Sequence, residues 1–206
     1  MRGEPSLWRG PAPLLLASTS ATRRTLLESA GLSVETEAPG IDERAIERAA
    51  IDEGAAEIAR RLAAAKAVAV SRRRPDQFVI GADQTLACEG TLFHKPADRA
   101  VAKTQLLALS GRTHVLNTAI ALARQGDIMC EAGQAARMTM RALSPADLER
   151  YFDLAGDAAL QSVGAYQLEG LGIHLFERIE GDHSTILGLP LLPLLAAFRE
   201  RGLLAL

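Results

Sequence analysis

The sequence predicts an α/β fold in which helices surround a mixed sheet. Segments with helical periodicity alternate with short apolar segments that are typical of buried strands. Two short polar stretches, residues 124–127 and 180–182, each separate two strand-like segments and indicate hairpins. Alternation favours parallel pairing and hairpins favour antiparallel pairing, so one mixed sheet accommodates both. We expect two lobes that enclose a deep cleft.

The first predicted strand and helix lie close together in the chain. Residues 13–18 form a short apolar segment that suits a buried strand. The helix that follows spans residues 21–30, with Ser20 as its N-cap and Gly31 as its C-terminal stop. The strand therefore leads almost directly into the start of a helix.

A long alanine-rich helix is predicted over residues 52–71. One of its faces carries the apolar residues Ile58, Leu62, Ala65 and Ala69. Its end is basic, which suits the negative end of the helix dipole. The strand that follows, residues 78–81, leads directly into Asp83.

The second half of the chain mixes long strands with helices. Helices are predicted over residues 98–109, after Ser144 as far as Gly156, and over 190–201. The two predicted hairpins pair residues 114–123 with 128–142, and 172–179 with 183–187.

Length and composition suit one globular domain. The chain has 206 residues, and we assign residues 13–206 to that domain and residues 1–12 to a loose N-terminal extension. A formal net charge of -2 argues against a nucleic-acid polymer as partner. Two cysteines indicate a reducing compartment, and we find neither a signal peptide nor an apolar run long enough for a membrane. We therefore expect a cytoplasmic protein.

Arg23 and Arg24 occupy the first turn of the helix predicted after Ser20. Positive side chains are unfavourable there because the helix N-terminus already carries partial positive charge. An anion would reverse that penalty, and small hydroxyl residues such as Ser18 let backbone N–H groups approach it. The segment therefore predicts either a phosphate site or a solvated basic turn paired with surface acids.

Asp83 follows a buried strand, and ligands of open α/β sheets gather beyond the carboxyl ends of strands. Its carboxylate could hold a divalent metal or accept a proton from water, or it could simply end the strand. Lys66 lies one turn beyond Leu62, so its stem points partly toward the core, where an ammonium group needs a partner unless it extends to solvent.

Lys95 and Glu43 are each ambiguous by themselves. Lys95 precedes a helix and could contact a polyphosphate, or it could be a surface lysine. Glu43 follows a Pro-Gly loop as part of Asp42-Glu43, a solvated acidic turn or a carboxylate that faces a metal. Together these residues favour a polyanionic ligand bound by cations and a carboxylate-held metal.

Seven short segments follow one another in order along the chain. They are LASTS with Arg23-Arg24, IGAD ending at Asp83, HKP around Lys95, LSGRTH at 109–114, GAYQLEGLG at 164–172, ERIEGD at 177–182 and GLP at 188–190. Together they resemble the Maf family of nucleoside triphosphate pyrophosphatases. The match runs from Leu14 to Leu203. The resemblance implies the Maf/ITPase-like fold and hydrolysis of a nucleoside triphosphate to a monophosphate and pyrophosphate.

The resemblance also implies roles for single residues. Asp83 would be the general base or a metal-linked carboxylate, and Glu43 would help to hold a divalent metal such as Mg²⁺, Mn²⁺ or Co²⁺. The residues that would bind phosphates are Ser18, Arg23, Lys66, Lys95 and, less directly, Arg24. A homodimer is a further expectation from the family.

Three positions relate to the choice of base. Gln84 and Glu169 resemble the subgroup that acts on 7-methyl-GTP, whereas Thr22 matches neither that subgroup nor the one that prefers dTTP and UTP. A carboxylate accepts hydrogen bonds only, so Glu169 suits the N1–H and 2-amino groups of a guanine-type base. We therefore expect a preference for 7-methyl-GTP, with dTTP or UTP as the alternative.

Two non-enzymatic alternatives predict nucleotide binding without turnover. One is a nucleotide-responsive regulator of cell division, and the other is a domain that only sequesters polyanions. Asp83, Lys95 and the paired arginines favour catalysis, because a sensor needs no general base.

Overall fold

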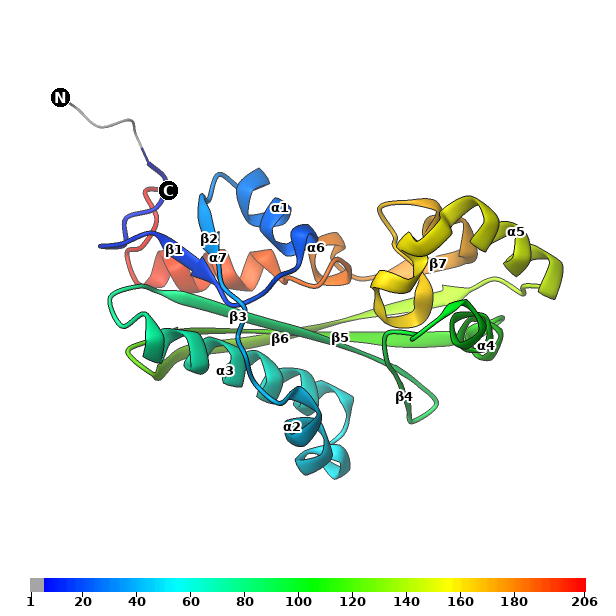
Figure 1. Cartoon of the computed structure of the whole chain (residues 1–206). Coiled ribbons are helices and arrows are strands. Elements are labelled where there is room, and N and C mark those ends of the chain that lie inside the picture. The colour runs from blue at the N-terminus through cyan, green and yellow to red at the C-terminus, as the bar shows by residue number, and fades with distance from the viewer. Residues whose placement is uncertain (1–5) are drawn as a thin grey trace. The chain divides into compact units, whose positions relative to one another are not determined.

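The computed structural model describes residues 6–206 and confirms the predicted α/β fold (Figure 1). The strands are β1 (Leu14–Leu16), β2 (Val34–Thr36), β3 (Val79–Cys88), β4 (Thr91–Phe93), β5 (Thr113–Arg124), β6 (Asp127–Met140) and β7 (Phe176–Glu180). The α-helices are α1 (Ala21–Ser29), α2 (Glu43–Ala49), α3 (Ala55–Arg73), α4 (Arg99–Leu109), α5 (Pro145–Ala155), α6 (His183–Ile186) and α7 (Leu191–Glu200). Short 3-10 helices are η1 (Ile51–Glu53), η2 (Gly156–Gln161), η3 (Val163–Ala165) and η4 (Leu171–Leu175).

The seven strands form one mixed sheet in the order β2-β1-β3-β5-β6-β7, with β4 paired to β3. Strand β1 pairs in parallel with β2 and with β3. Strands β3 and β4 pair antiparallel, as do β6 and β7. The predicted hairpin between β5 and β6 is present, and its turn residues Gln125 and Gly126 both have positive φ, as two-residue hairpins favour.

The chain folds as two compact units. Unit 1 comprises the described chain up to Gln84 together with Thr118–Gln134 and Leu187–Leu206, and unit 2 comprises Thr85–Asn117 and Ala135–Ile186. Strands β3, β5 and β6 each contribute residues to both units.

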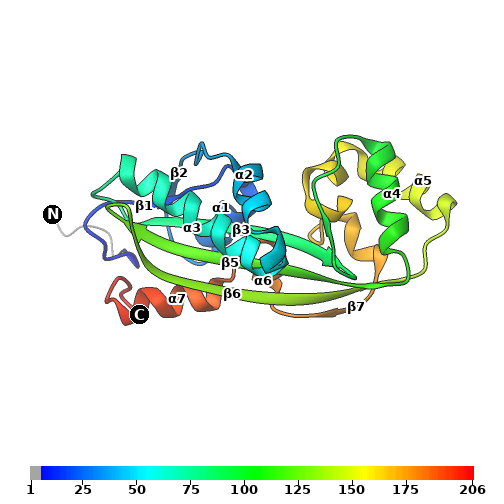
Figure 2. The ribbon, with the colours of Figure 1, turned by 90° about the horizontal axis from the view of Figure 1, so that it is seen from below.

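Unit 1 has helices on both faces of its strands (Figure 1). Seen from below, α3 lies in front of the strands (Figure 2). The side chains of β5 alternate between these two layers of helices. The small residues Ala119, Ala121 and Ala123 pack against α3. The larger residues Ile120 and Leu122 pack on the opposite face, toward α1 and α7. Alternate side chains of a strand point to opposite faces, so small residues admit α3 closely and larger ones fill the opposite core.

The buried stripe of α3 explains its place in the fold. It recurs at three- and four-residue spacing and contains Ile58, Ala59, Leu62, Ala63, Lys66, Ala67, Val70 and Ser71. The stripe includes one charged residue, Lys66, as the helical spacing predicts.

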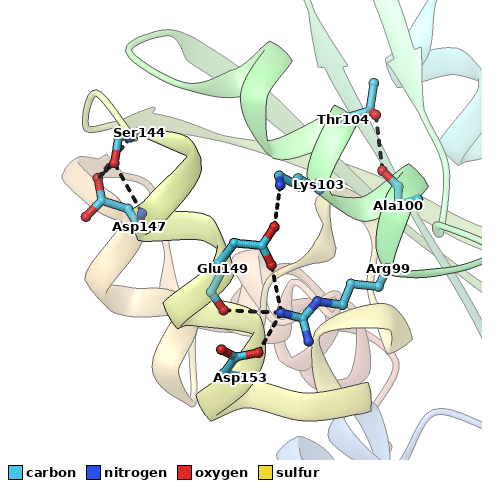
Figure 3. Close-up of polar contacts among 8 residues, drawn as sticks. All are labelled: Arg99, Ala100, Lys103, Thr104, Ser144, Asp147, Glu149 and Asp153. Carbon is cyan, nitrogen blue, oxygen red and sulfur yellow. Dashed lines mark hydrogen bonds and ion pairs between the residues drawn. The ribbon is translucent and has the colours of Figure 1, made fainter.

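Unit 2 has its own apolar core. Residues of α4, α5 and the strand ends form it, among them Leu106, Leu148 and Met138. On the surface, Arg99 of α4 donates to Glu149 and Asp153 of α5, and Lys103 also pairs with Glu149 (Figure 3). Exposed ion pairs of this kind contribute little to stability, so the apolar core holds α4 and α5 together.

The predicted hairpin around residues 180–182 is wrong. Strand β7 ends at Glu180, and residues 183–186 form helix α6 instead of a strand. Asp182 causes the difference, since its carboxylate accepts a hydrogen bond from the backbone N–H of Thr185 at 3.1 Å, as an N-cap does.

Glu43 also lies in a helix, α2, and not in the expected loop. Asp42 caps that helix by accepting from the backbone N–H of Ala45 at 3.0 Å.

Part of the predicted N-terminal extension, residues 1–5, lies outside the described residues. Trp8 forms an antiparallel bridge with Leu204, and its ring packs edge-on against Phe78 and Phe198. Among the described residues, none of the helices is long and apolar enough to cross a membrane.

Candidate functional site

Strand β3 directs Asp83 toward α3. Side chains alternate along a strand, so Asp83 shares a face with Gly81. Gly81 packs directly on α3, because a Cβ built there would lie 2.1 Å from the carbonyl oxygen of Ala63. Asp83 itself is only 8% exposed. It lies within β3, which runs on to Cys88, and not in a turn after the strand.

Lys66 is the partner that α3 supplies to Asp83. Its Nζ lies 2.6 Å from Oδ1 of Asp83 and 3.0 Å from Oε1 of Glu43. Lys66 is 6% exposed, so its ammonium group satisfies the need for a partner predicted from its helical position. One buried cation therefore bridges two carboxylates from different elements, β3 and α2.

Glu43 is the accessible member of this cluster. It is the first residue of α2, and its side chain is 49% exposed. A carboxylate in the first helical turn is favoured by the helix dipole. The cluster Asp83–Lys66–Glu43 thus runs from the buried strand to the surface.

Arg23 binds backbone carbonyls of unit 1. Its Nε donates to the carbonyl oxygen of Gly188 at 2.7 Å, and its Nη1 donates to that of Ala82 at 2.9 Å. Nη1 also lies 3.4 Å from Oγ of Ser18. The planar guanidinium thereby connects α1, β3 and the segment before α7, an arrangement that a single ammonium cannot copy.

Ser18 and Ser20 shape the turn between β1 and α1. Oγ of Ser18 accepts a hydrogen bond from the backbone N–H of Ser20 at 3.2 Å. Oγ of Ser20 accepts from the backbone N–H of Arg23 at 3.3 Å and caps α1 as predicted. These two hydrogen bonds order the turn from which α1 and Arg23 begin.

Burial and charge oppose each other at this cluster. Burial raises the pKa of Asp83, while Lys66 and Arg23 act to lower it. Burial lowers the pKa of Arg23, and the carboxylates of Asp83 and Glu43 oppose that change. Since each charge is removed from water, each depends on its oppositely charged neighbours.

Arg24 does not join the cluster. Its Nε lies 3.7 Å from Oε1 of Glu28, one turn further along α1, and both side chains are about half exposed. Of the two alternatives predicted for this turn, the solvated basic turn paired with a surface acid describes Arg24. The Arg23 side chain instead points into unit 1, where it contacts Gly188 and Ala82.

Two of the three base-selection candidates belong to unit 1. Thr22 is half-buried on α1. Gln84 follows Asp83 in β3 and so points to the opposite face, where its Nε2 donates to Oγ1 of Thr118 at 2.8 Å. This hydrogen bond orients the Gln84 amide.

Lys95 and Glu169 belong to unit 2. Lys95 is exposed in the loop between β4 and α4. That loop is anchored by Gln105, whose Nε2 donates to the carbonyl oxygen of His94 at 3.0 Å. Glu169 is exposed in the turn between η3 and η4.

Comparison with known proteins decides the family. Residues 13–201 match the family described as "Maf-like protein". The chain belongs to the Maf family. Its relatives include a protein of Nitrobacter winogradskyi named nucleoside triphosphate pyrophosphatase, 60% identical over 98% of this chain and 100% of the relative. A relative of the same name from Bradyrhizobium diazoefficiens is 57% identical over 97% and 98%.

A third relative has a narrower name. The protein of Mesorhizobium japonicum named 7-methyl-GTP pyrophosphatase is 52% identical, over 92% of this chain and 96% of the relative.

In this Maf-family chain, sequence reasoning missed the partners that hold the predicted residues in place. Gly188 has φ of 92°, and a Cβ there would lie 3.2 Å from Nε of Arg23, so glycine both permits the backbone and admits the guanidinium. Gly188 belongs to the GLP segment at residues 188–190, which contributed to the family resemblance but indicated no structural role for the glycine. Thr118 directly precedes the apolar run of β5, residues 119–123, and that polar position was its signal.

The Asp83–Lys66–Glu43 cluster contains two carboxylates that could bind a divalent metal, those of Asp83 and Glu43. Among residues 6–206, no group of three or more histidine, cysteine, aspartate or glutamate side chains could hold a metal ion. Mg²⁺ commonly binds one or two carboxylates and takes its remaining ligands from water and substrate phosphates. The residues present therefore fit a metal that arrives with a polyphosphate.

Proposed function

We propose that this Maf-family chain hydrolyses nucleoside triphosphates to monophosphates and pyrophosphate, with a divalent metal ion. The Asp83–Lys66–Glu43 cluster, which is buried at Asp83 and Lys66 and accessible at Glu43, carries the proposal. It combines a candidate base, a cation and a second carboxylate in unit 1, and Arg23 interacts electrostatically with both carboxylates. The names of its relatives in Nitrobacter and Bradyrhizobium support the same reaction.

Each residue has a defined task in this proposal. Asp83 accepts the proton of the water that attacks the α-phosphorus, and Lys66 and Arg23 neutralise phosphate oxygens. Ser18 adds a hydroxyl donor at the turn before α1. Asp83 and Glu43 would hold the metal, which stabilises negative charge on the reacting and leaving phosphate oxygens.

Lys95 is proposed as a further phosphate contact. It follows β4 on an exposed loop, where a long flexible side chain can follow a mobile phosphate. Arg24 contributes less in this proposal, because its guanidinium pairs with Glu28.

We also propose 7-methyl-GTP as the preferred substrate. Glu169 offers an acceptor-only carboxylate, which suits the N1–H and 2-amino groups of guanine and the positive charge that N7-methylation adds. Gln84, oriented by Thr118, is the second polar side chain proposed to select the base. The relative named 7-methyl-GTP pyrophosphatase supports this assignment.

Pyrophosphate release across a panel of triphosphates tests both parts. The purified full chain is assayed with 7-methyl-GTP, GTP, dTTP, UTP, ATP and CTP, each with Mg²⁺, Mn²⁺ or Co²⁺ and each with excess chelator. We expect pyrophosphate, and no orthophosphate, with the highest kcat/KM for 7-methyl-GTP and no turnover under chelation. Highest turnover of dTTP or UTP would refute the base preference alone. Nucleotide binding without release would refute the enzyme and favour a regulator.

A further inference from the structure

The ammonium group of Lys66 contacts both carboxylates that are proposed to hold the metal ion, Asp83 and Glu43. Its Nζ is 2.6 Å from Oδ1 of Asp83 and 3.0 Å from Oε1 of Glu43. A divalent ion held by the same two carboxylates would lie close to Nζ. Both are positively charged, so the ammonium opposes binding of the ion.

Lys66 and Arg23 differ in how they are held. Arg23 donates to two backbone carbonyls, which do not move independently of the fold. The described contacts of the Lys66 ammonium are with two carboxylates, and one of them, Glu43, is half exposed. Lysine has a flexible stem with a rotatable terminal group, so Nζ can change partners while the stem stays on the buried stripe of α3.

A triphosphate supplies what this change of partners needs. It offers phosphate oxygens to the ammonium, and it brings a divalent ion that can take over both carboxylates. Free metal supplies only the second of these, and it would leave the ammonium, only 6% exposed as a residue, without a counter-ion.

We propose that Lys66 is an internal cation that blocks the Asp83–Glu43 pair against free metal and is transferred to phosphate when the metal–triphosphate complex binds. Metal and nucleotide therefore bind with positive coupling: each raises the affinity of the protein for the other by a factor of about 5 to 150, as is usual for coupled sites. The transfer to phosphate rests on the proposed function, whereas the block against free metal does not.

Binding of Mn²⁺ alone tests the block without any nucleotide. Isothermal titration calorimetry or electron paramagnetic resonance measures Mn²⁺ affinity of the wild-type chain, Lys66→Gln, Lys66→Met and Lys66→Arg. Lys66→Gln retains a hydrogen-bond donor for buried Asp83. It therefore provides a folded neutral variant for the measurement if Lys66→Met does not fold. Lys103→Met is the matched control, since it removes a lysine paired with Glu149 in unit 2.

We expect the neutral variants to bind Mn²⁺ with a Kd at least about tenfold lower than the wild-type chain, because an internal competitor is lost. Lys66→Arg and Lys103→Met should stay weak, and Asp83→Asn added to Lys66→Gln should abolish the gain. Unchanged or weaker Mn²⁺ binding in folded Lys66→Gln would overturn the proposal, whatever the outcome of the turnover assays.

The NH₃⁺ resonance of Lys66, assigned with Lys66→Arg, tests the transfer. We expect it to shift when Mg²⁺ and an α,β-methylene triphosphate analogue are added together, and to stay in place with Mg²⁺ alone at the same concentration. A shift with Mg²⁺ alone would contradict the block. No shift when the bound analogue and Mg²⁺ are both present would contradict the transfer, and failure of the analogue to bind would count against the proposed function instead.

Discussion

Gly81 lies so close to α3 that a Cβ on it would stand 2.1 Å from the carbonyl oxygen of Ala63 and 2.7 Å from the backbone nitrogen of Ala67. Both atoms belong to backbone, which cannot rotate away as a side chain can. The contact sets the distance between β3 and α3, and that distance decides whether Lys66 reaches Asp83. The close packing of Gly81 against α3 therefore helps to bring the charged groups of Lys66 and Asp83 into contact.

Gly81→Ala is expected to damage both stability and the cluster. Overpacking against backbone should lower the free energy of unfolding by about 1–3 kcal/mol, measured by urea denaturation. Pyrophosphate release should fall as well, because α3 must move. Gly133→Ala is the matched control in β6, since its Cβ would lie 3.6 Å from the nearest atom, an ordinary contact. Equal stability of the two variants would contradict the packing argument.

Asp83→Asn should abolish most of the turnover while keeping the fold. General-base catalysis usually contributes about 10²- to 10⁴-fold, so pyrophosphate release should fall by a factor in that range. Circular dichroism checks the fold. Asp76→Asn, which alters an exposed aspartate in a turn of unit 1, should turn over normally. Turnover of Asp83→Asn within a factor of two of the wild-type chain would remove Asp83 from its role.

Arg23→Lys should destabilise unit 1 even though the charge is kept. A lysine cannot donate to the carbonyl oxygens of Gly188 and Ala82 in the same planar arrangement, so one buried acceptor loses its partner. The expected loss in free energy of unfolding is about 1–3 kcal/mol. Arg24→Lys changes an exposed residue and should stay within about 0.5 kcal/mol of the wild-type chain. If Arg23→Lys and Arg24→Lys have the same Tm in thermal denaturation, Arg23 does not hold these segments together as proposed.

His114 should make folding weaker in acid. Burial lowers its pKa to about 4, and its Nε2 lies 2.7 Å from Oη of Tyr166. The unfolded chain takes up this proton near pH 6.5, but the folded chain takes it up only near 4. The contribution is therefore complete above pH 6.5 and is lost as pH falls toward 4, at about 1.4 kcal/mol per pH unit, or about 3 kcal/mol in total.

Urea denaturation at pH 4 to 7 isolates this contribution by difference. His114→Gln should flatten the pH dependence of the free energy of unfolding relative to the wild-type chain. His174→Gln, which removes an exposed histidine of the same unit, should leave the wild-type slope. Parallel curves for the wild-type chain and His114→Gln would show that His114 titrates alike in both states.

The sequence predicted elements well where periodicity and caps agreed. Helix α1 begins after its Ser20 cap, and Ser144 forms a reciprocal capping box with Asp147 at the start of α5. Helix α6 was missed because its β-branched residues resemble a strand, whereas the Asp182 cap is a local signal that outweighs them. The same kind of signal, Asp42 ahead of Glu43, marks the start of α2.

The candidate site could be predicted in part. Helical spacing placed Lys66 toward the core, and the structure gives it two carboxylates. Which carboxylates these would be depends on contacts between β3, α2 and α3, and local sequence carries no information on such contacts. For the same reason the inward course of Arg23 and the outward course of Arg24 could not be separated from sequence, since both occupy the first turn of α1.

The alternation of β3 has a consequence for insertions and deletions. Asp83 faces α3 and Gln84 faces Thr118, so neighbouring residues serve opposite sides of the sheet. Deleting one residue of β3 ahead of Asp83 would shift the register by one and turn every later side chain over. Gln84 would then take the place that faces Lys66, and the Asp83 carboxylate would turn to the opposite side of the sheet. Homologous chains should therefore vary in length in their loops and tolerate no single-residue gap between Val79 and Gln84.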